Sequence, residues 1–277
     1  MQHHTESLFL RFWGVRGSIP APGKDFVRYG GETTCLEVRA GERTLIVDCG
    51  SGIRALGNKL EADGVREVDV LLSHTHLDHI YGLPFFRLAY DPNCSVRFFA
   101  GHLEDGRGLR EVLERIMTPT LYPVALEELL GSAFETFRGG GQLTLAPDLT
   151  IDTMRLNHPG GCIGYRITRG GRSVCIITDH EHGNAMIDAE LHTFVRGADV
   201  MIYDAMFDDS EYARYEGWGH STWQKGLKLA IEADVRTPIL THHDPSRTDE
   251  DLDRLSEEIA RQHPGAIVAW EGLEVSI

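Results

Sequence analysis

Three histidines and an aspartate fall within six residues, in the segment His74-Thr75-His76-Leu77-Asp78-His79. Imidazole nitrogens and carboxylate oxygens are good ligands for zinc and similar divalent ions. An apolar run over residues 68–72, typical of a short buried strand, comes just before this segment. A coincidental histidine-rich loop is the alternative, but this spacing at the end of a strand favours a metal centre.

Three more candidate ligands stand singly behind predicted strands. His158, Asp179 and His242 follow the apolar runs 151–156, 174–178 and 239–241. Each alone is typical of a loop residue, but strand ends at one edge of an α/β protein converge on a site. With the first segment they supply enough ligands for two metal ions, namely His74, His76, Asp78, His79, His158, Asp179 and His242. His243 is the rival of His242 for the last position.

The elements that position these residues alternate between strand-like and helical patterns. We expect strands over residues 8–13, 35–38, 44–47, 68–72, 143–145, 150–156, 164–168, 174–178, 200–203, 238–241 and 266–270. We expect helices over residues 53–62, 109–117, 187–195, 222–233 and 249–262, and one more that begins near Ile80. Runs of strands with helices between them predict an α/β fold in which sheets pack face to face.

Length and composition limit the class of protein. The sequence contains no apolar run near the roughly 20 residues of a membrane span, and its first residues lack a signal-peptide pattern. We therefore expect one domain over residues 1–277, located in the cytoplasm, with residues 103–141 as a candidate lid or dimer contact. The five cysteines form no CxxC pair, which indicates reduced buried thiols and argues against disulfides or a thiolate metal site.

The net charge of −15 indicates which kind of molecule the protein binds. Proteins that bind long nucleic acids usually carry a basic face, because contacts to phosphates supply most of the affinity. The acidic total therefore favours a small ligand, attracted by the charge of the metal, over a nucleic acid.

The metal segment and the three later ligands resemble the metallo-β-lactamase superfamily over nearly the whole chain, and most closely its ribonuclease Z branch. The resemblance implies a four-layer αββα sandwich of two mixed β-sheets with helices outside. It also implies two Zn²⁺ ions, with Mn²⁺ or Fe²⁺ as alternatives. By this resemblance His74, His76 and His158 hold the first ion, Asp78, His79 and His242 hold the second, and Asp179 bridges the two.

Two further motifs fit this branch. Gly219-His220-Ser221-Thr222 resembles a motif whose histidine contacts the scissile phosphate, and Asp204 stands where the branch carries an acid that orients that histidine. The resemblance thus makes Asp78, His220 and Asp204 the catalytic residues. A metal-bound hydroxide, aligned by Asp78, would attack phosphorus while His220 donates to a phosphoryl oxygen or to the leaving group. A structural role for His220 at the start of a helix is the alternative.

Other segments narrow the resemblance to one subgroup of this branch. Residues 12–20, 29–33 and 242–245 are similar to a bacterial subgroup that includes anti-Pycsar cyclic-nucleotide phosphodiesterases. This implies a 3′,5′-cyclic nucleotide as the substrate and a homodimer. Glu32 and Leu77 depart from the Asn and Trp of that subgroup. Arg16 is expected either to contact a substrate phosphate or to hold the glycine-rich loop by a salt bridge.

Several functions stay open beside the small phosphodiesterase. The first alternative is an RNA-processing nuclease, although only 20 residues separate His158 from Asp179, which leaves no room for the tRNA-gripping arm of ribonuclease Z. The second is a thioester or lactone hydrolase, which would not need the Gly-His-Ser-Thr motif. A metal-stabilised binding module is the non-enzyme alternative.

The remaining polar candidates receive structural roles. Asp48 is expected to be hydrogen-bonded beneath the histidine segment. His180 and His182 lie close to Asp179 in the sequence and are expected to be solvated loop residues. Surface positions are expected for His102, His192 and His263. His3 and His4 are set aside.

Overall fold

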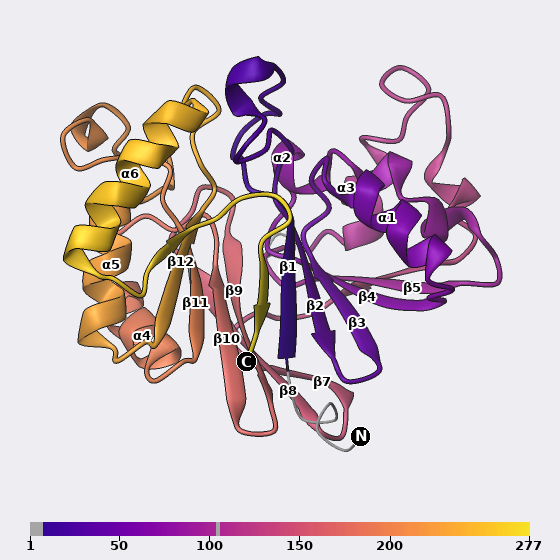
Figure 1. Cartoon of the computed structure of the whole chain (residues 1–277). Coiled ribbons are helices and arrows are strands. Elements are labelled where there is room, and N and C mark those ends of the chain that lie inside the picture. The colour runs from indigo at the N-terminus through magenta and orange to yellow at the C-terminus, as the bar shows by residue number, and fades with distance from the viewer. Residues whose placement is uncertain (1–7, 104–105) are drawn as a thin grey trace.

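Two seven-stranded β-sheets pack face to face in the computed structural model, which describes residues 8–103 and 106–277 (Figure 1). The first sheet has the order β14 (Glu274–Ser276), β1 (Leu8–Gly14), β2 (Cys35–Ala40), β3 (Arg43–Val47), β4 (Glu67–Leu72), β5 (Ser95–Ala100) and β6 (Ser132–Thr136). The second has the order β13 (Ile267–Val268), β12 (Thr237–Thr241), β11 (Val200–Asp204), β10 (Arg172–Ile177), β9 (Cys162–Arg169), β8 (Leu149–Leu156) and β7 (Gln142–Ala146). His3 and His4 lie outside the described residues.

Both sheets are mixed, as predicted. Strands β3 to β6 run parallel in the first sheet, and strands β10 to β13 run parallel in the second. The other neighbouring pairs are antiparallel. Apolar side chains from the two inner faces, such as Leu10, Val38, Ile151 and Ile176, form one shared buried cluster between the sheets.

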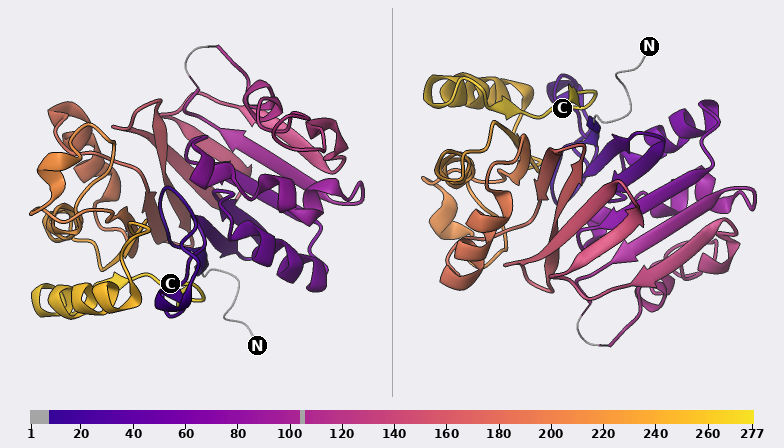
Figure 2. Two further views of the ribbon diagram at one scale, coloured as in Figure 1. Left: turned by 90° about the horizontal axis from the view of Figure 1, so that it is seen from above. Right: turned by 90° about the horizontal axis from the view of Figure 1, so that it is seen from below.

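Helices cover the outer faces and complete the four-layer αββα sandwich (Figures 1 and 2). On the side of the first sheet these are α1 (Ile53–Ala62), α2 (Leu77–Ile80) and α3 (Leu109–Glu114), and on the side of the second they are α4 (Ala185–Val195), α5 (Trp223–Glu232) and α6 (Asp249–Gln262). Short 3₁₀ helices lie at Lys24–Phe26, Leu83–Phe85, Arg87–Tyr90, Leu126–Glu128 and Tyr212–Arg214. No helix in the described ranges is long and apolar enough to cross a membrane.

The sequence-based boundaries are wrong in a few places. Strands β5, β6 and β14 were not expected, and the strand expected at 266–270 has only two residues. The helix expected to begin near Ile80 instead ends there, because the chain then turns to pack Gly82 against Gly50, whose carbonyl oxygen would lie 2.2 Å from a Cβ at position 82. Within residues 103–141, β6 is the edge strand of the first sheet and pairs with β5. A role of this segment as lid or dimer contact stays a prediction.

Candidate metal centre

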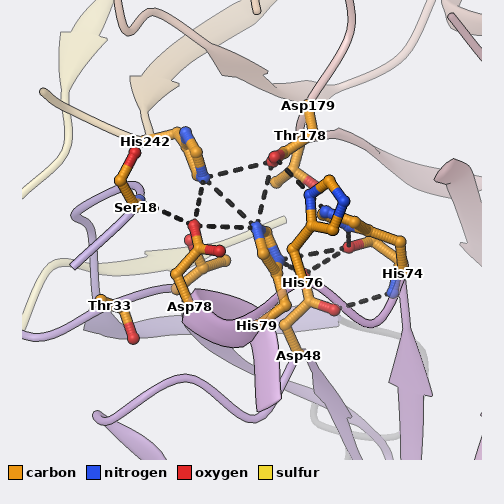
Figure 3. A network of polar contacts seen from close by, with 12 residues as sticks. Ser18, Thr33, Asp48, His74, His76, Asp78, His79, Thr178, Asp179 and His242 are labelled. Carbon is orange, nitrogen blue, oxygen red and sulfur yellow. Dashed lines mark hydrogen bonds and ion pairs between the residues drawn. The ribbon is translucent and has the colours of Figure 1, made fainter. Parts of the chain in front are cut away.

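The seven predicted ligands meet at the carboxyl ends of strands from both sheets. His74 follows the last residue of β4 by two positions, and His158 and Asp179 follow β8 and β10 by two positions. His242 comes directly after β12. Figure 3 shows all of these ligands except His158, and their side chains come from distant parts of the chain and point toward one another. The polar atoms at these strand ends therefore face one common space.

One group of four donor atoms has the spacing of a tetrahedral metal site. His79 Nε2 lies 3.3 Å from Asp78 Oδ2 and 3.3 Å from Asp179 Oδ1. His242 Nε2 lies 3.3 Å and 3.2 Å from the same two oxygens, and 3.3 Å from His79 Nε2. Ligand atoms about 2.0–2.1 Å from a tetrahedral zinc ion lie roughly 3.3 Å from one another. The five measured separations thus match the edges of one coordination tetrahedron.

The charges around His79 favour a cation. His79 Nδ1 donates a hydrogen bond to Asp48 Oδ2 at 2.8 Å, so in the neutral ring the lone pair is on Nε2. That lone pair then faces two carboxylate oxygens. Burial opposes a charge on this ring, yet the carboxylates of Asp179, Asp78 and Asp48 raise the pKa of His79 well above its usual range. This negative field is suited to a bound divalent cation.

A second group consists of three histidines. The donor atoms of His74, His76 and His158 all lie within 4.8 Å of one another. Asp179 Oδ2 lies 3.7 Å from His74 Nε2 and 3.8 Å from His158 Nε2, whereas Oδ1 of the same carboxylate faces the other group. Asp179 therefore presents one oxygen to each group. The far nitrogen of His158, Nδ1, donates to the carbonyl oxygen of Gly219 at 2.8 Å, which directs Nε2 toward the centre.

The backbone is strained at this centre. Five non-glycine residues in the described ranges have a left-handed φ, and four of them are Ser18 (63°), Asp48 (65°), Asp179 (52°) and His242 (59°). Such conformations cost roughly 1–3 kcal/mol each and persist where the surroundings impose them, often at functional sites. Ser18 uses its conformation to donate its backbone N–H to Asp78 Oδ2 at 2.7 Å.

His220 and Asp204 form a pair beside the centre. His220 Nδ1 lies 2.9 Å from Asp204 Oδ2, and the His220 ring stacks on that of His242 with 5.1 Å between centroids. Burial lowers the pKa of His220, but Asp204, Asp179 and Asp78 together raise it to about 9. The ring is thus fixed through one nitrogen, while its Nε2 has no hydrogen-bond partner within residues 8–103 and 106–277.

Asp48 and His243 are structural neighbours of the ligands. Besides His79, Asp48 accepts hydrogen bonds from the backbone N–H of Ser73 at 2.7 Å and from Ser73 Oγ at 2.8 Å, as expected for a support of the histidine segment. His243 is fully buried and its Nε2 faces the carbonyl oxygen of Ala269 at 2.9 Å. The structure thus places His242, and not His243, among the donor atoms.

Both roles predicted for Arg16 are wrong. Its side chain is fully buried and cannot contact a substrate. The guanidinium donates to the carbonyl oxygens of Gly30, Asp244 and Arg247 at 2.8, 3.3 and 2.7 Å. It therefore holds loops together through carbonyl groups, and it forms no salt bridge with a residue of the described ranges.

Two histidines expected at the surface are also buried. His102 is 5% exposed and its Nε2 contacts Thr75 Oγ1 at 3.0 Å, beside the metal segment. His180 is fully buried, and its Nδ1 accepts the backbone N–H of Asn157 at 3.3 Å. His180 closely follows the predicted strand over residues 174–178, and this position was the available signal for its burial. No such signal was available for His102, because the strand before it was not expected. His192 and His263 are partly exposed.

The sequence did not single out Glu181 as a functional residue. Its carboxylate accepts hydrogen bonds from Tyr212 Oη at 2.5 Å and from the backbone N–H groups of Gly217 and Gly219 at 2.6 and 2.7 Å. Gly219 has a φ of +88°, and a Cβ there would lie 2.2 Å from His158 Nδ1. Glu181 therefore fixes the loop that both supports His158 and carries His220.

The fold and the donor set together define a metal-dependent hydrolase that binds a divalent cation. The chain belongs to the beta-lactamase superfamily domain family, whose family model matches residues 43–243. Ribonuclease Z of Gemmatimonas aurantiaca is 25% identical to it, over 98% of this chain and 96% of that protein.

Two solved structures are similar to this chain. The metallo-beta-lactamase fold protein YhfI from Bacillus subtilis superposes with a TM-score of 0.74 and 20% identity, over 98% of this chain and 100% of that one. A diphosphatase from the PhnP family superposes with a TM-score of 0.67 and 18% identity, over 98% and 97% of the two chains. At these identities the structures support the fold.

Proposed function

We propose that this protein is a dinuclear phosphodiesterase that hydrolyses a small phosphodiester, with a 3′,5′-cyclic nucleotide as the preferred substrate. The observation that carries the proposal is the His220–Asp204 pair beside the two donor groups. A metal-binding module would not need a fixed imidazole with a free nitrogen at the edge of its site. Phosphoryl transfer does benefit from such a donor, because negative charge develops on the phosphoryl and leaving oxygens.

The donor groups suit two ions. We assign His74, His76 and His158 to one ion, Asp78, His79 and His242 to the other, and Asp179 to both. Zn²⁺ fits the imidazole and carboxylate ligands, and Mn²⁺ or Fe²⁺ are alternatives. When bound, two such ions supply Lewis acidity, which lowers the pKa of a water molecule and neutralises charge on phosphoryl oxygens.

The protein residues orient the reactants. Asp78, held by the backbone N–H of Ser18, accepts a hydrogen bond from the nucleophilic water and directs its lone pair toward phosphorus. His220, held through Nδ1 by Asp204, donates from Nε2 to a phosphoryl oxygen or to the leaving group. General acids in this role contribute about 10²- to 10⁴-fold in rate.

A hollow beside the histidine groups supports a small anionic substrate. It has a volume of about 400 Å³ and is lined by His102, Leu103, Arg107, Arg155, Leu156, Gly160, Gly161, Cys162, Ile163 and Ile187. A Cβ at Gly160 would lie 3.7 Å from His76 Nε2, so the hollow borders the metal centre. Arg107 and Arg155 line this hollow, and a guanidinium group is a side chain that can bind a phosphate.

RNA processing is the second candidate, because relatives that match nearly the whole chain are named ribonuclease Z. The acidic charge and the 20-residue interval between His158 and Asp179 favour the small substrate. A homodimer, a cytoplasmic location and a single domain over residues 1–277 stay predictions from the sequence.

The test is hydrolysis of bis-p-nitrophenyl phosphate and of a panel of cyclic mononucleotides by the zinc- and manganese-loaded protein. We expect the wild type to open at least one cyclic nucleotide and Asp78→Ala and His220→Ala to lose activity. His192→Ala is the matched control, since His192 contacts the Glu232 carbonyl oxygen on the outer helices. Cleavage of only the generic diester or of RNA would contradict the proposed cyclic-nucleotide substrate. Cleavage of thioesters or lactones alone would overturn the proposed phosphodiesterase activity.

A further inference from the structure

A chain of polar side-chain contacts runs behind the centre, from the first turn of α4 to the loops that carry the site residues. Its members are His180, His182, Asp188, Tyr203 and Ser221. None of them is one of the seven candidate ligands, and none belongs to the His220–Asp204 pair. The chain therefore lies outside the proposed catalytic groups, although it borders them.

The backbone determines where His180 carries its proton. His180 Nδ1 accepts the backbone N–H of Asn157 at 3.3 Å, so the ring is neutral and its proton lies on Nε2. That nitrogen lies 3.4 Å from Asp188 Oδ1, and an ionised carboxylate can only accept. His180 therefore donates to Asp188.

The same carboxylate oxygen determines the proton of His182. His182 Nδ1 lies 3.3 Å from Asp188 Oδ1. Burial lowers the pKa of His182 to about 4 even though Asp188 raises it, so the ring is neutral and has one proton near pH 7. A lone pair on Nδ1 would face the carboxylate and be repelled by it. The proton therefore lies on Nδ1, and Nε2 is an acceptor.

Two hydroxyl groups extend the chain to the loop of His220. Tyr203 Oη contacts His182 Nε2, and the phenol donates its single hydrogen there because that nitrogen is an acceptor. Tyr203 Oη also lies 3.1 Å from Ser221 Oγ, so the serine hydroxyl is the donor in that contact. Tyr203 and Ser221 are both buried, which leaves water little access to these groups.

The chain adjoins three site residues in the sequence. The three neighbouring pairs are Asn157 and His158, Asp179 and His180, and His220 and Ser221. They lie after β8, after β10 and before α5. The other oxygen of Asp188 accepts the backbone N–H of Gly183 at 3.0 Å, so the common acceptor of both rings is itself fixed. One carboxylate on α4 thus connects three loops of the site.

We propose that Asp188 and Tyr203 are positioning residues for the reaction. Through the two histidines of the chain, they hold the loops of His158, Asp179 and His220 in the arrangement that hydrolysis requires. This role rests on the proposed phosphodiesterase function. It is measurable because a misplacement of about 1 Å can lower a rate by roughly 100-fold.

The proton positions are tested by NMR of metal-free protein labelled with ¹⁵N-histidine. The ring signals of His182 are assigned by their absence from His182→Gln. We expect the proton of His182 on Nδ1 in the wild type, and a changed His182 pattern in Asp188→Asn. A proton on Nε2 in the wild type would overturn the proposal, because Tyr203 could then not donate to His182 and the chain would be broken.

The positioning role is tested by kcat and KM for bis-p-nitrophenyl phosphate in Asp188→Asn, Tyr203→Phe and the double variant. We expect each single variant to lower kcat by about 10-fold or more with KM little changed. The double variant should lose no more than the larger single loss, because both changes break one chain. The matched controls are Glu190→Gln on α4 and Tyr90→Phe, whose hydroxyl donates to the Pro84 carbonyl oxygen at 2.8 Å, and both should keep the wild-type kcat.

Wild-type kcat in both folded variants, or losses that multiply in the double variant, would overturn the positioning role. Circular dichroism reports folding, and if Tyr203→Phe does not fold, the comparison of Asp188→Asn with Glu190→Gln decides alone.

A wild type that cleaves no phosphodiester would contradict the proposed function, and zinc affinity then decides about the chain. We expect Asp188→Asn to bind Zn²⁺ about 10-fold more weakly than Glu190→Gln, since the segments of His158 and Asp179 lose their support. Equal zinc affinities in that case would overturn the inference.

Discussion

Replacing Asp48 by asparagine tests how the buried support of His79 controls the metal centre. Asp48 Oδ2 accepts from His79 Nδ1 and Ser73 Oγ, and Oδ1 accepts from the backbone N–H of Ser73. An amide has only one oxygen, so its NH₂ group must face one of these donors in either orientation. If the NH₂ group faces His79, it donates to Nδ1 and moves the ring proton to Nε2. That is the atom that faces Asp78 and Asp179.

The expected loss is large enough to measure. Loss of a partner that orients a metal ligand typically costs 10- to 100-fold in metal affinity, which is about 1.4–2.7 kcal/mol. If the amide instead turns its oxygen to His79, the buried N–H of Ser73 loses its acceptor, and the free energy of unfolding falls by about 1–3 kcal/mol. Either orientation therefore produces a defect, and the two defects differ in kind.

The assay is competition for Zn²⁺ between the protein and a chromophoric chelator, with thermal unfolding measured on the same samples. Asp69→Asn is the matched control, because Asp69 is also buried and accepts from Arg43 Nη1 at 3.1 Å and Arg97 Nε at 2.7 Å, away from the ligands. We expect the control to lose stability and to keep its zinc affinity. Wild-type affinity together with wild-type stability in Asp48→Asn, or equal losses of affinity in both variants, would refute the reasoning.

Two further predictions concern the loop that carries His220. Glu181→Gln leaves at least one of its three donors, Tyr212 Oη and the backbone N–H groups of Gly217 and Gly219, without an acceptor. We therefore expect the free energy of unfolding to fall by about 1–3 kcal/mol and kcat to fall as well. The control Glu190→Gln, on the surface of α4, should change neither quantity. An unchanged melting temperature and kcat would show that the loop does not depend on Glu181. Burial raises the pKa of Asp208, but hydrogen bonds from Ser210, Gln224 and Trp223 lower it from 3.8 to about 2. A depressed pKa contributes stability above pH 4 that is lost as the pH falls toward 2. Asp208→Asn should therefore flatten the dependence of the melting temperature on pH across this window, and an unaltered slope would contradict the assignment.

Local signals in the sequence were sufficient for helices α1 and α6. The predicted bounds of α1 and α6 agree with the structure. Helix α6 begins with a capping box in which Thr248 and Asp251 satisfy each other's backbone N–H groups, and it buries Leu252, Leu255 and Ile259 along one face. These determinants lie within a few residues of each other and can therefore be recognised without knowledge of the tertiary fold.

The missed strands depend on partners that are distant in the sequence. Strand β5 carries Arg97, whose charge obscures the apolar run, and this side chain is accommodated because it pairs with Asp69 on the neighbouring β4. Strand β6 is mostly exposed and exists because it adds to the edge of β5. The three residues of β14 likewise pair only with β1. No local periodicity marks such strands.

The candidate ligands could be predicted from the sequence because they stand at or near the ends of predicted strands. The residues that hold these ligands in place could not be predicted. Glu181 stands between His180 and His182 in a short segment. The sequence alone does not show to which side of this segment each of the three side chains points. The structure resolves this, since Glu181 reaches Gly219 while His180 turns toward Asp188. Arg16 was misassigned for a similar reason, because a charged residue in a glycine-rich loop gives no sign of its burial.

Backbone strain links the supports to the ions. Asp48, Asp179 and His242 each hold a left-handed φ, and together they cost on the order of 3–9 kcal/mol, against a typical total stability of about 5–15 kcal/mol. Hydrogen bonds offset this strain at Asp48, which accepts three. Asp179 Oδ1 has no hydrogen-bond partner among the described residues, so the compensation at this centre must come from elsewhere. Under the proposed ligand assignment, a cation bound to Asp179 Oδ1 and His242 Nε2 would supply it, which would explain why the chain keeps two strained ligands at strand ends of the same sheet.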